Sequence, residues 1–214
     1  MRNFILFDLD GTLTDPKEGI TKSVCYALHF FNIEKNPDDV VSFIGPPLKQ
    51  QFKEFAALSD KQAEKAVEVY RERFAPIGIY ENKLIDGIIP MLDELCKRGA
   101  KMAVATSKPT VFAKKIADRF GISRFMEGVF GSELDGTDTD KACVIKKAMK
   151  KLGALPQNTV MVGDRIHDIT GAEKNKIPAI GVTFGYAPPG ELEKSNAAAV
   201  CASPEELLKI LISM

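Results

Sequence analysis

FILFDLDGTLTD, residues 4–15, is the stretch that decides the fold. Its apolar run ends in two aspartates, Asp8 and Asp10, which are separated by a single leucine. Short apolar runs of this kind are typical of strands that are buried on both faces of a parallel sheet. Burying a carboxylate is costly, and a like-charged neighbour raises that cost. The stretch therefore predicts a buried strand whose end carries a charged site with a compensating partner.

Further apolar runs predict more strands of the same sheet, at residues 101–107, 128–132, 159–164 and 179–185 and, more weakly, 197–203. Helical segments with start and stop signals lie between them, at residues 87–98, 109–120 and 141–152. Asp86 and Asp140 are the expected caps of the first and last of these helices, and Pro109 opens the middle one. Alternating strands and helices predict an α/β fold with a doubly wound, mostly parallel, Rossmann-like sheet.

One interval breaks this alternation. No convincing strand lies between Asp10 and Lys101, although a crossover helix needs only about a dozen residues. Apolar side chains in the interval recur at helical spacing, which predicts packed helices; they include Ile20, Val24, Ala27, Leu28, Phe31, Leu48, Phe52, Phe55, Ala63, Val67, Tyr70 and Phe74. We therefore expect a small helical bundle at residues 16–82, inserted into a core made of residues 1–15 and 83–214.

Composition narrows the classes of partner. The chain of 214 residues has 29 basic and 29 acidic side chains, so no overall field favours a nucleic acid polymer or a membrane surface. Its apolar runs are too short to span a bilayer, and no signal-like cleavage region follows the N-terminus, so we expect a cytoplasmic location. The four cysteines are scattered, which fits neither a zinc site nor a disulfide framework. The oligomeric state is left open.

Polar residues gather at the expected strand ends. In an open parallel sheet, ligands bind at the carboxyl ends of the strands. The residues at or near these ends are Asp8, Asp10, Thr106, Ser107, Lys141, Asp164 and Asp168. Mg²⁺ prefers hard oxygen ligands and is typically shared between carboxylates and substrate phosphate, and a divalent cation would remove the repulsion between the acids. The pattern predicts a magnesium ion that holds a phosphoryl group.

Four segments, DLDGTLTD, VATSK, Lys141 and VGDRIHD, resemble the four motifs of the haloacid dehalogenase superfamily in the order that this family uses. The similarity spans residues 8–168, and the helical insert lies where that family carries its cap domain. The DxDGT sequence directly after an apolar strand is the most specific of the four.

The resemblance implies a role for each matching acid. Asp8 would be the nucleophile that takes the phosphoryl group, and Asp10 would protonate the leaving oxygen and then activate water. Asp8 and Asp164, with the backbone carbonyl of Asp10, would ligate magnesium, and Asp168 would contact the metal through water or orient a ligand. Because an alkoxide needs a proton to leave and a halide does not, Asp10 favours phosphoryl transfer over dehalogenation.

The same resemblance implies a phosphate-binding set. Thr106 and Lys141 would hold the non-bridging phosphoryl oxygens, with backbone N–H groups after Asp8 and near Ser107. The implied reaction is hydrolysis of a small phosphorylated metabolite by a phosphoric monoester hydrolase.

The insert and the sequence IGPPL at residues 44–48 resemble the phosphoglycolate phosphatase-like branch, which includes 5′-nucleotidases and pyrophosphatases. Candidate substrate contacts in the insert are Gly45, Pro46, Pro47 and Lys49. A tight loop that joins two helices would explain the same residues.

Several alternatives stay open at this point. The substrate could be phosphoglycolate or a nucleoside 5′-monophosphate, and a pyrophosphatase or sugar phosphomutase would carry the same motifs. A non-enzymatic, phospho-accepting receiver module also has strand-end acids, but it lacks the second aspartate and the large insert. A direct role for His167 is open, whereas the acids of residues 135–140 lack the ligand spacing of an EF-hand and predict a polar turn.

Overall fold

The structure is a computed structural model that describes residues 3–214. Residues 3–14 and 84–214 form one compact unit, the core unit, and residues 15–83 form a second, the insert unit. Each is described by itself. The chain crosses between them twice, and the short strands β2 (Thr14–Asp15) and β3 (Lys83–Leu84) pair with each other at these crossings.

The core unit is built on a parallel sheet. Among residues 3–214 this sheet has six strands in the order β5-β4-β1-β6-β7-β8. Their bounds are β1 (Phe4–Phe7), β4 (Lys101–Pro109), β5 (Met126–Ser132), β6 (Thr159–Gly163), β7 (Ala179–Val182) and β8 (Ala199–Cys201). Strand order reverses beside β1, because the chain builds outward to β5 on one side and then returns to β6 on the other. The predicted doubly wound α/β class is confirmed.

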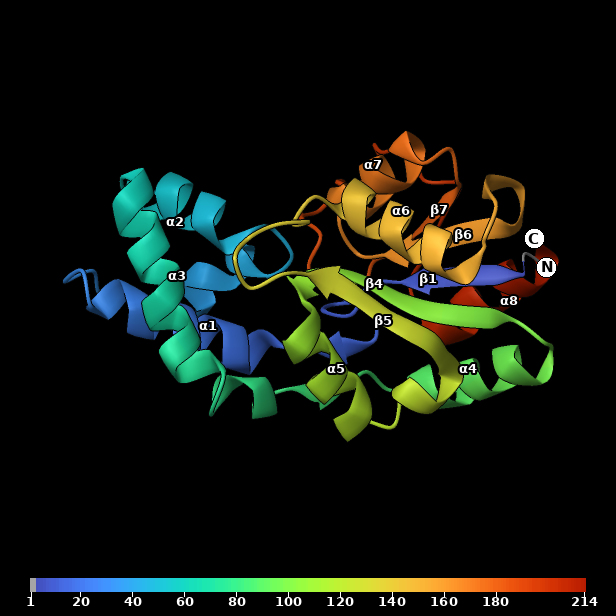
Figure 1. Cartoon of the computed structure of the whole chain (residues 1–214), viewed down its shortest axis with the longest axis horizontal. Coiled ribbons are helices and arrows are strands. Elements are labelled where there is room, and N and C mark those ends of the chain that lie inside the picture. The colour runs from blue at the N-terminus through green and yellow to red at the C-terminus, as the bar shows by residue number, and fades with distance from the viewer. Residues whose placement is uncertain (1–2) are drawn as a thin grey trace. The chain divides into compact units, whose positions relative to one another are not determined.

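Helices cover both faces of this sheet (Figure 1), with α6 and α7 on one side and α4 and α5 on the other. Their bounds are α4 (Ile88–Lys97), α5 (Thr110–Arg119), α6 (Lys141–Leu152), α7 (Ile166–Lys174) and α8 (Pro204–Ser213), with short 3-10 turns η3 (Ser123–Phe125) and η4 (Pro156–Asn158). Phe4 and Leu6 of β1 pack in one apolar cluster with Val144 of α6 and Ile169 of α7. All four residues of β1 are buried, which explains why the strand reads as a continuous apolar run.

The expected helix starts are right in two cases and wrong in one. The Asp140 carboxylate accepts a hydrogen bond from the N–H of Ala142 at 2.9 Å and so caps α6, and Pro109 directly precedes α5. Asp86 does not cap α4, because the chain enters that helix through Gly87 with φ of 85°. Glycine adopts this left-handed conformation at little cost, and it leaves Asp86 one residue too early to act as the cap.

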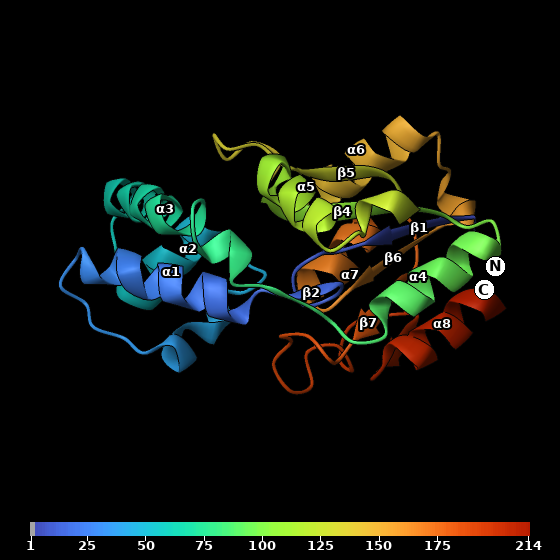
Figure 2. The same cartoon turned by 90° about the horizontal axis from the view of Figure 1, so that it is seen from below.

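The insert unit is helical. It contains α1 (Lys17–His29), η1 (Pro37–Phe43), α2 (Leu48–Ala56), α3 (Asp60–Phe74) and η2 (Gly78–Tyr80), and α1, α2 and α3 lie grouped in Figure 2. Its apolar interior includes an edge-to-face pair of Phe43 and Phe52, whose ring centroids are 5.1 Å apart. These aromatic side chains are therefore packing residues of the bundle. No helix within residues 3–214 is both long and apolar enough to cross a membrane.

Candidate active site

The centre of the sheet brings two of the predicted acids to one edge. Phe7 of β1 pairs with Val162 of β6, and the N–H of Asp8 donates to the carbonyl oxygen of Val162 at 2.8 Å. Asp8 directly follows β1, and Asp164 directly follows β6. Both carboxylates therefore lie at the carboxyl ends of neighbouring strands, beside the reversal of strand order where ligands bind in such sheets.

Asp8, Asp164 and Asp168 form a buried acidic cluster. Each offers one carboxylate oxygen, and these oxygens all lie within 4.8 Å of one another. The residues are only 5%, 0% and 1% exposed. Among residues 3–214 this is the one group of acidic, histidine or cysteine side chains placed to hold a metal ion.

Lys141 lies inside the acidic cluster. Its Nζ is 2.7 Å from Oδ1 of Asp8 and 2.7 Å from Oδ1 of Asp168, and it donates to the carbonyl oxygen of Ala105 at 3.2 Å. The side chain is 5% exposed. Sequence reasoning predicted a phosphate contact for Lys141 and missed its ion pairs with the two acids, which arise because α6 begins against the end of β4.

Charge in this cluster is only partly balanced. Burial raises the pKa of Asp164 well above its ordinary value, and the carboxylates of Asp168 and Asp8 raise it further against the opposing N–H of Tyr186. Burial also raises the pKa of Asp168 to about 6, with Lys141 opposing the rise and Asp8 adding to it. Burial would lower the pKa of Lys141, but Asp168 and Asp8 outweigh it and raise that pKa. The cluster therefore favours additional positive charge.

The donor set fits a magnesium ion. Three carboxylates face one ammonium group, so the fully ionised cluster carries an excess of two negative charges, which a divalent cation would neutralise. All the candidate ligands are hard oxygens, as Mg²⁺ prefers. Asp8, Asp164 and Asp168 are thus the side chains that could hold the metal, whereas the Asp10 carboxylate is not part of the group.

The backbone around Asp164 is shaped to fix its carboxylate. Its Oδ2 accepts a hydrogen bond from the N–H of Tyr186 at 2.7 Å, and Thr12 Oγ1 lies 3.5 Å from its Oδ1. Gly11 has φ of 81°, and a Cβ there would lie 2.2 Å from Asp164 Oδ2. The glycine of the DGT sequence is therefore required both by its backbone conformation and by the close approach of Asp164. Such outer contacts orient a metal-binding carboxylate.

Asp10 has a separate partner. Its Oδ2 lies 2.6 Å from Nζ of Lys108, and both side chains are largely buried. Burial raises the pKa of Asp10, while the positive charge of Lys108 opposes the rise. The loop after β1 folds back tightly, with the N–H groups of Leu13 and Thr14 both donating to the carbonyl oxygen of Leu9. Sequence reasoning missed Lys108 as the partner of Asp10, because the register of β4 shifts between Ala105 and Pro109 and strand alternation does not place this side chain.

Thr106 and Ser107 lie near the end of β4, beside β1. Thr106 is 2% exposed, and its Oγ1 accepts a hydrogen bond from the N–H of Lys108 at 3.3 Å. The Ser107 carbonyl accepts a hydrogen bond from Ser132 Oγ at 2.8 Å, which ties this segment to β5. Because Lys141 contacts the carbonyl of Ala105, Thr106 lies at the same sheet edge as the acidic cluster.

The other candidate contacts, Gly45, Pro46, Pro47 and Lys49, lie in the insert unit. Gly45 has φ of 103°, and Pro47 precedes the first residue of α2, as in a tight connection between η1 and α2. Lys49 is about half exposed and pairs with Glu64 of α3 at 2.7 Å. The connection between two helices explains why these residues occur here. Their contact with substrate stays a prediction.

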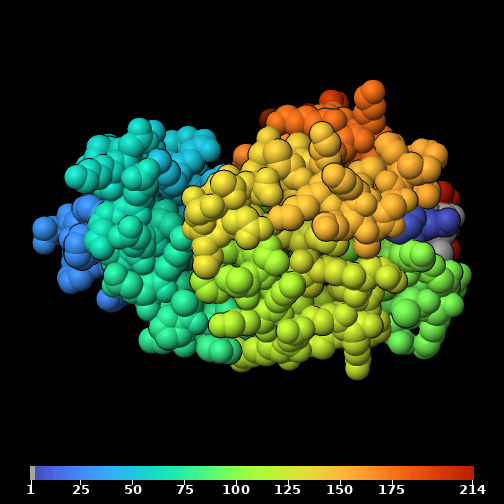
Figure 3. Space-filling view, in the orientation of Figure 1, coloured from blue at the N-terminus to red at the C-terminus, as the bar shows by residue number. Residues whose placement is uncertain are grey.

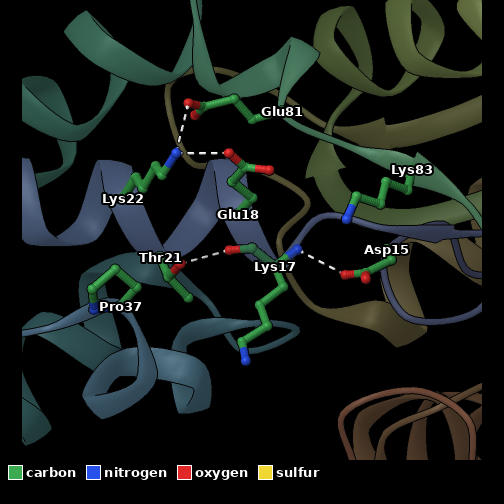
Figure 4. Close-up of a pocket in the computed structure, with 8 residues that line it drawn as sticks. All are labelled: Asp15, Lys17, Glu18, Thr21, Lys22, Pro37, Glu81 and Lys83. Atoms are coloured by element: carbon green, nitrogen blue, oxygen red, sulfur yellow. Dashed lines mark hydrogen bonds and ion pairs between the residues drawn. The ribbon is translucent and has the colours of Figure 1, made fainter.

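A pocket of about 200 Å³ in the insert unit contains none of the predicted site residues. Its lining residues are Asp15, Lys17, Glu18, Thr21, Lys22, Pro37, Glu81 and Lys83 (Figure 4). Three acidic and three lysine side chains line the pocket, so their charges balance, and Lys22 pairs with Glu18 and Glu81. The pocket offers no convergent acidic or basic set, and we place the candidate chemistry in the acidic cluster.

Residues 133–140 form the predicted polar turn. They follow β5, lie mainly at the surface (Figure 3), and are held by Asp135 Oδ1, which accepts from both the N–H and the hydroxyl of Thr137. Lys147 pairs with Glu133 and Asp138 beside the turn. His167 is exposed near the start of α7, unlike its buried neighbour Asp168. A direct role for His167 stays untested.

The charge imbalance at Asp164 leads to a stability prediction. Asp164→Asn is expected to raise the free energy of unfolding of the metal-free protein at about pH 8, by about 1.4 kcal/mol for each unit of pKa elevation that it removes. The folded-state pKa lies above the unfolded value of 3.8, so the wild type loses stability as pH rises through the folded pKa. The gain should therefore shrink as pH falls towards 3.8.

Urea unfolding with EDTA across this pH range measures the effect, with the exposed Asp86→Asn as the matched control. Added Mg²⁺ should stabilise the wild type and the control but not Asp164→Asn. A variant less stable than the wild type in EDTA at about pH 8 would contradict the charge argument.

Comparison with known proteins places the chain in a family. Residues 5–182 match the haloacid dehalogenase-like hydrolase family. A 5′-nucleotidase of Pseudomonas aeruginosa is 44% identical over 98% of this chain and 95% of its own length. A crystal structure of a predicted phosphatase from Clostridium acetobutylicum superposes with a TM-score of 0.97 at 42% identity, covering 100% of both chains.

A third relative carries a different name. The tyrosine-protein kinase PtkA of Mycobacterium tuberculosis is 36% identical over 97% of this chain and 72% of its own length. The similarity in each case spans the acidic motifs and the inserted helices, as the sequence motifs predict. The chain belongs to the haloacid dehalogenase-like hydrolase family, in a group whose relatives include phosphatases.

Proposed function

We propose that this protein is a magnesium-dependent phosphatase that hydrolyses a small phosphate monoester through an aspartyl-phosphate intermediate. The buried cluster of Asp8, Asp164 and Asp168 around Lys141 carries this proposal. Such a cluster at the end of β1 combines a nucleophile, a place for a divalent cation and a fixed positive charge. Phosphoryl transfer through an aspartyl phosphate uses these three elements.

In the first step, a carboxylate oxygen of Asp8 forms a bond to phosphorus while the ester P–O bond breaks. Asp10, in its protonated form, gives a proton to the departing oxygen and becomes a carboxylate. The products of this step are the free alcohol and an acyl phosphate on Asp8. The elevated pKa of Asp10 favours the protonated form that this step requires.

In the second step, the Asp10 carboxylate takes a proton from water while the water oxygen bonds to phosphorus. The P–O bond to Asp8 breaks, which restores the Asp8 carboxylate and releases inorganic phosphate. The two steps together consume one ester and one water molecule and yield one alcohol and one phosphate. Asp10 returns to its protonated state.

The remaining residues are the proposed contacts to the magnesium ion and to the charged phosphoryl oxygens. Asp8, Asp164 and Asp168, with the backbone carbonyl of Asp10, are the proposed holders of magnesium, which when bound supplies positive charge beside the phosphoryl oxygens. Lys141 and Thr106, with backbone N–H groups after Asp8 and near Ser107, are the proposed contacts to those oxygens. Lys141 also holds Asp8 in place through its ion pair at 2.7 Å.

A nucleoside 5′-monophosphate is the first substrate class to test, because a relative aligned over 98% of this chain is named a 5′-nucleotidase. Phosphoglycolate is the second, because the insert and the IGPPL sequence resemble that branch. The choice between these esters is the proposed role of the insert unit, including Gly45, Pro46, Pro47 and Lys49.

The deciding experiment measures inorganic phosphate released from a panel of substrates, with Mg²⁺ and with EDTA. The panel holds nucleoside monophosphates, phosphoglycolate, pyrophosphate, a hexose phosphate with and without its bisphosphate, and ATP with a tyrosine-containing peptide. Multiple turnovers on a monoester, lost in EDTA, are expected. Phosphoryl transfer only to a sugar or a tyrosine, or a single turnover that leaves a stable phosphoprotein, would overturn the proposal in favour of a mutase, a kinase or a receiver module.

Asp10→Asn tests the acid-base role. We expect turnover of alkyl phosphates to fall by about 10²- to 10⁴-fold, because asparagine cannot give a proton to the alkoxide. The rate of the first step with p-nitrophenyl phosphate should fall much less, because p-nitrophenolate leaves without being protonated. Steady-state and pre-steady-state rates on both esters measure the difference. Equal losses in the first step would contradict the acid role.

A further inference from the structure

Lys108 is a buried cation for which the reaction described above has no task. Its side chain is 7% exposed, and its Nζ lies 2.6 Å from Oδ2 of Asp10, whose side chain is 10% exposed. A lysine is rarely buried to this extent without a partner, because removing its charge from water is costly. The buried ion pair of Lys108 and Asp10 is therefore a structural feature of the site.

A bulge in β4 and a hydrogen bond to β5 fix the backbone around Lys108. Between Ala105 and Pro109, β4 advances by four residues while its partner β5 advances by two, which places a bulge at residues 106–108. Ser132 Oγ donates to the carbonyl oxygen of Ser107 at 2.8 Å, within this bulge. Bulges re-aim side chains and are frequent beside active sites. The Lys108 side chain thus extends to Asp10 from a fixed point.

The two oxygens of Asp10 have different surroundings. Oδ2 faces Lys108, whereas Oδ1 is buried and has no hydrogen-bond partner within residues 3–214. Leaving a buried carboxylate oxygen unpaired is unfavourable, so a site that keeps one has a use for it or fills it with a ligand. Oδ1 is therefore the oxygen of Asp10 that is left without a protein partner among the described residues.

We propose that Lys108 is a positioning residue that holds Asp10 Oδ2 so that Oδ1 carries out the proton transfers. This inference rests on the proposed function. Oδ1 gives its proton to the leaving oxygen as the ester bond breaks, and later takes one from water as the new P–O bond forms. Lys108 keeps its own protons throughout and acts only by fixing the carboxylate.

The test compares Lys108→Met with the wild type on an alkyl phosphate and on p-nitrophenyl phosphate, resolving kcat and KM. We expect kcat on the alkyl ester to fall by about 10²-fold, the cost of a misplaced catalytic group, with KM changed by less than about threefold. The first-step rate on p-nitrophenyl phosphate should change little. Lys108→Arg, which keeps the cation, should recover part of the loss.

A double-mutant cycle links the effect to Asp10. In the Asp10→Asn background, Lys108→Met should cause almost no further loss, because the group that it positions is already inactive. Lys115→Met, an exposed lysine on α5, is the matched control and should behave as the wild type. Thermal unfolding checks that each variant is folded, and Lys108→Gln replaces Lys108→Met if the latter cannot be purified.

Three results would overturn the inference: equal losses on both esters, a full additional loss on top of Asp10→Asn, or a raised KM with kcat retained. The last would make Lys108 a substrate contact. A wild-type protein that releases phosphate from no ester would instead refute the proposed function itself. The wild-type assay therefore separates the two failures.

Discussion

Asp8→Asn is expected to abolish turnover, with kcat lowered by at least about 10⁴-fold on every substrate that the wild type hydrolyses. The amide has nearly the shape of the carboxylate, so Lys141 can still donate to its oxygen and the fold should be retained. It cannot form the acyl phosphate, because its oxygen is a weak nucleophile. Asp8 Oδ1 is already fixed 2.7 Å from Lys141, so the loss reflects chemistry rather than position.

Two measurements check this expectation. Phosphate release gives kcat, and intact-mass analysis of acid-quenched enzyme detects the phosphorylated wild-type protein and its absence in the variant. Asp86→Asn, the same substitution at an exposed position before α4, is the control and should keep wild-type activity. A variant rate within about tenfold of the wild type would refute the nucleophile assignment.

Lys141→Met is expected to have the largest effect on stability. Lys141 lies between Oδ1 of Asp8 and Oδ1 of Asp168 at 2.7 Å each, and all three side chains are buried. Removing the cation from a buried ion pair costs about 3–5 kcal/mol, because the remaining charges have no partner. We expect a destabilisation of this size in EDTA at about pH 8, and loss of activity with it.

The pH dependence of that loss has a definite sign. Without Lys141, the folded-state pKa of Asp168, which burial already raises to about 6 in the wild type, should rise further, because Lys141 opposes that rise. Stability is then lost as pH rises through the folded pKa of Asp168, so the deficit should be smaller at about pH 5 than at about pH 8. Urea unfolding at both pH values, with the exposed Lys146→Met of the same helix as control, measures it. A deficit independent of pH would argue against the electrostatic cause.

Much of the fold follows from local patterns. The apolar runs at residues 4–7, 159–163 and 179–182 are strands, because strands covered on both faces must be apolar at every position. Asp140 caps α6 because its side chain reaches an N–H only two residues away. The predicted cap at Asp86 was wrong for an equally local reason, because Gly87, with its positive φ, occupies the N-cap position of α4.

Part of the candidate site was likewise predictable from local patterns, and part was not. Asp8 and Asp164 were predictable, because each directly follows a recognisable strand and parallel strands end at one edge. The contact of Lys141 with Asp168 was not, because it depends on how α6 and α7 pack over β4 and β6. The Tyr186 N–H that holds Asp164 comes from a segment 22 residues later with no pattern of its own.

By itself, the sequence determined the α/β class and the acids that directly follow β1 and β6, because hydrophobic period, turn residues and strand-end acids are local properties. Only the tertiary structure decided which charges meet. Lys141 contacts Asp8 and Asp168, and a bulge in β4 turns Lys108 to Asp10. Ion pairing falls off over a few ångströms, so it is set by where long side chains end in space rather than by their order in the chain.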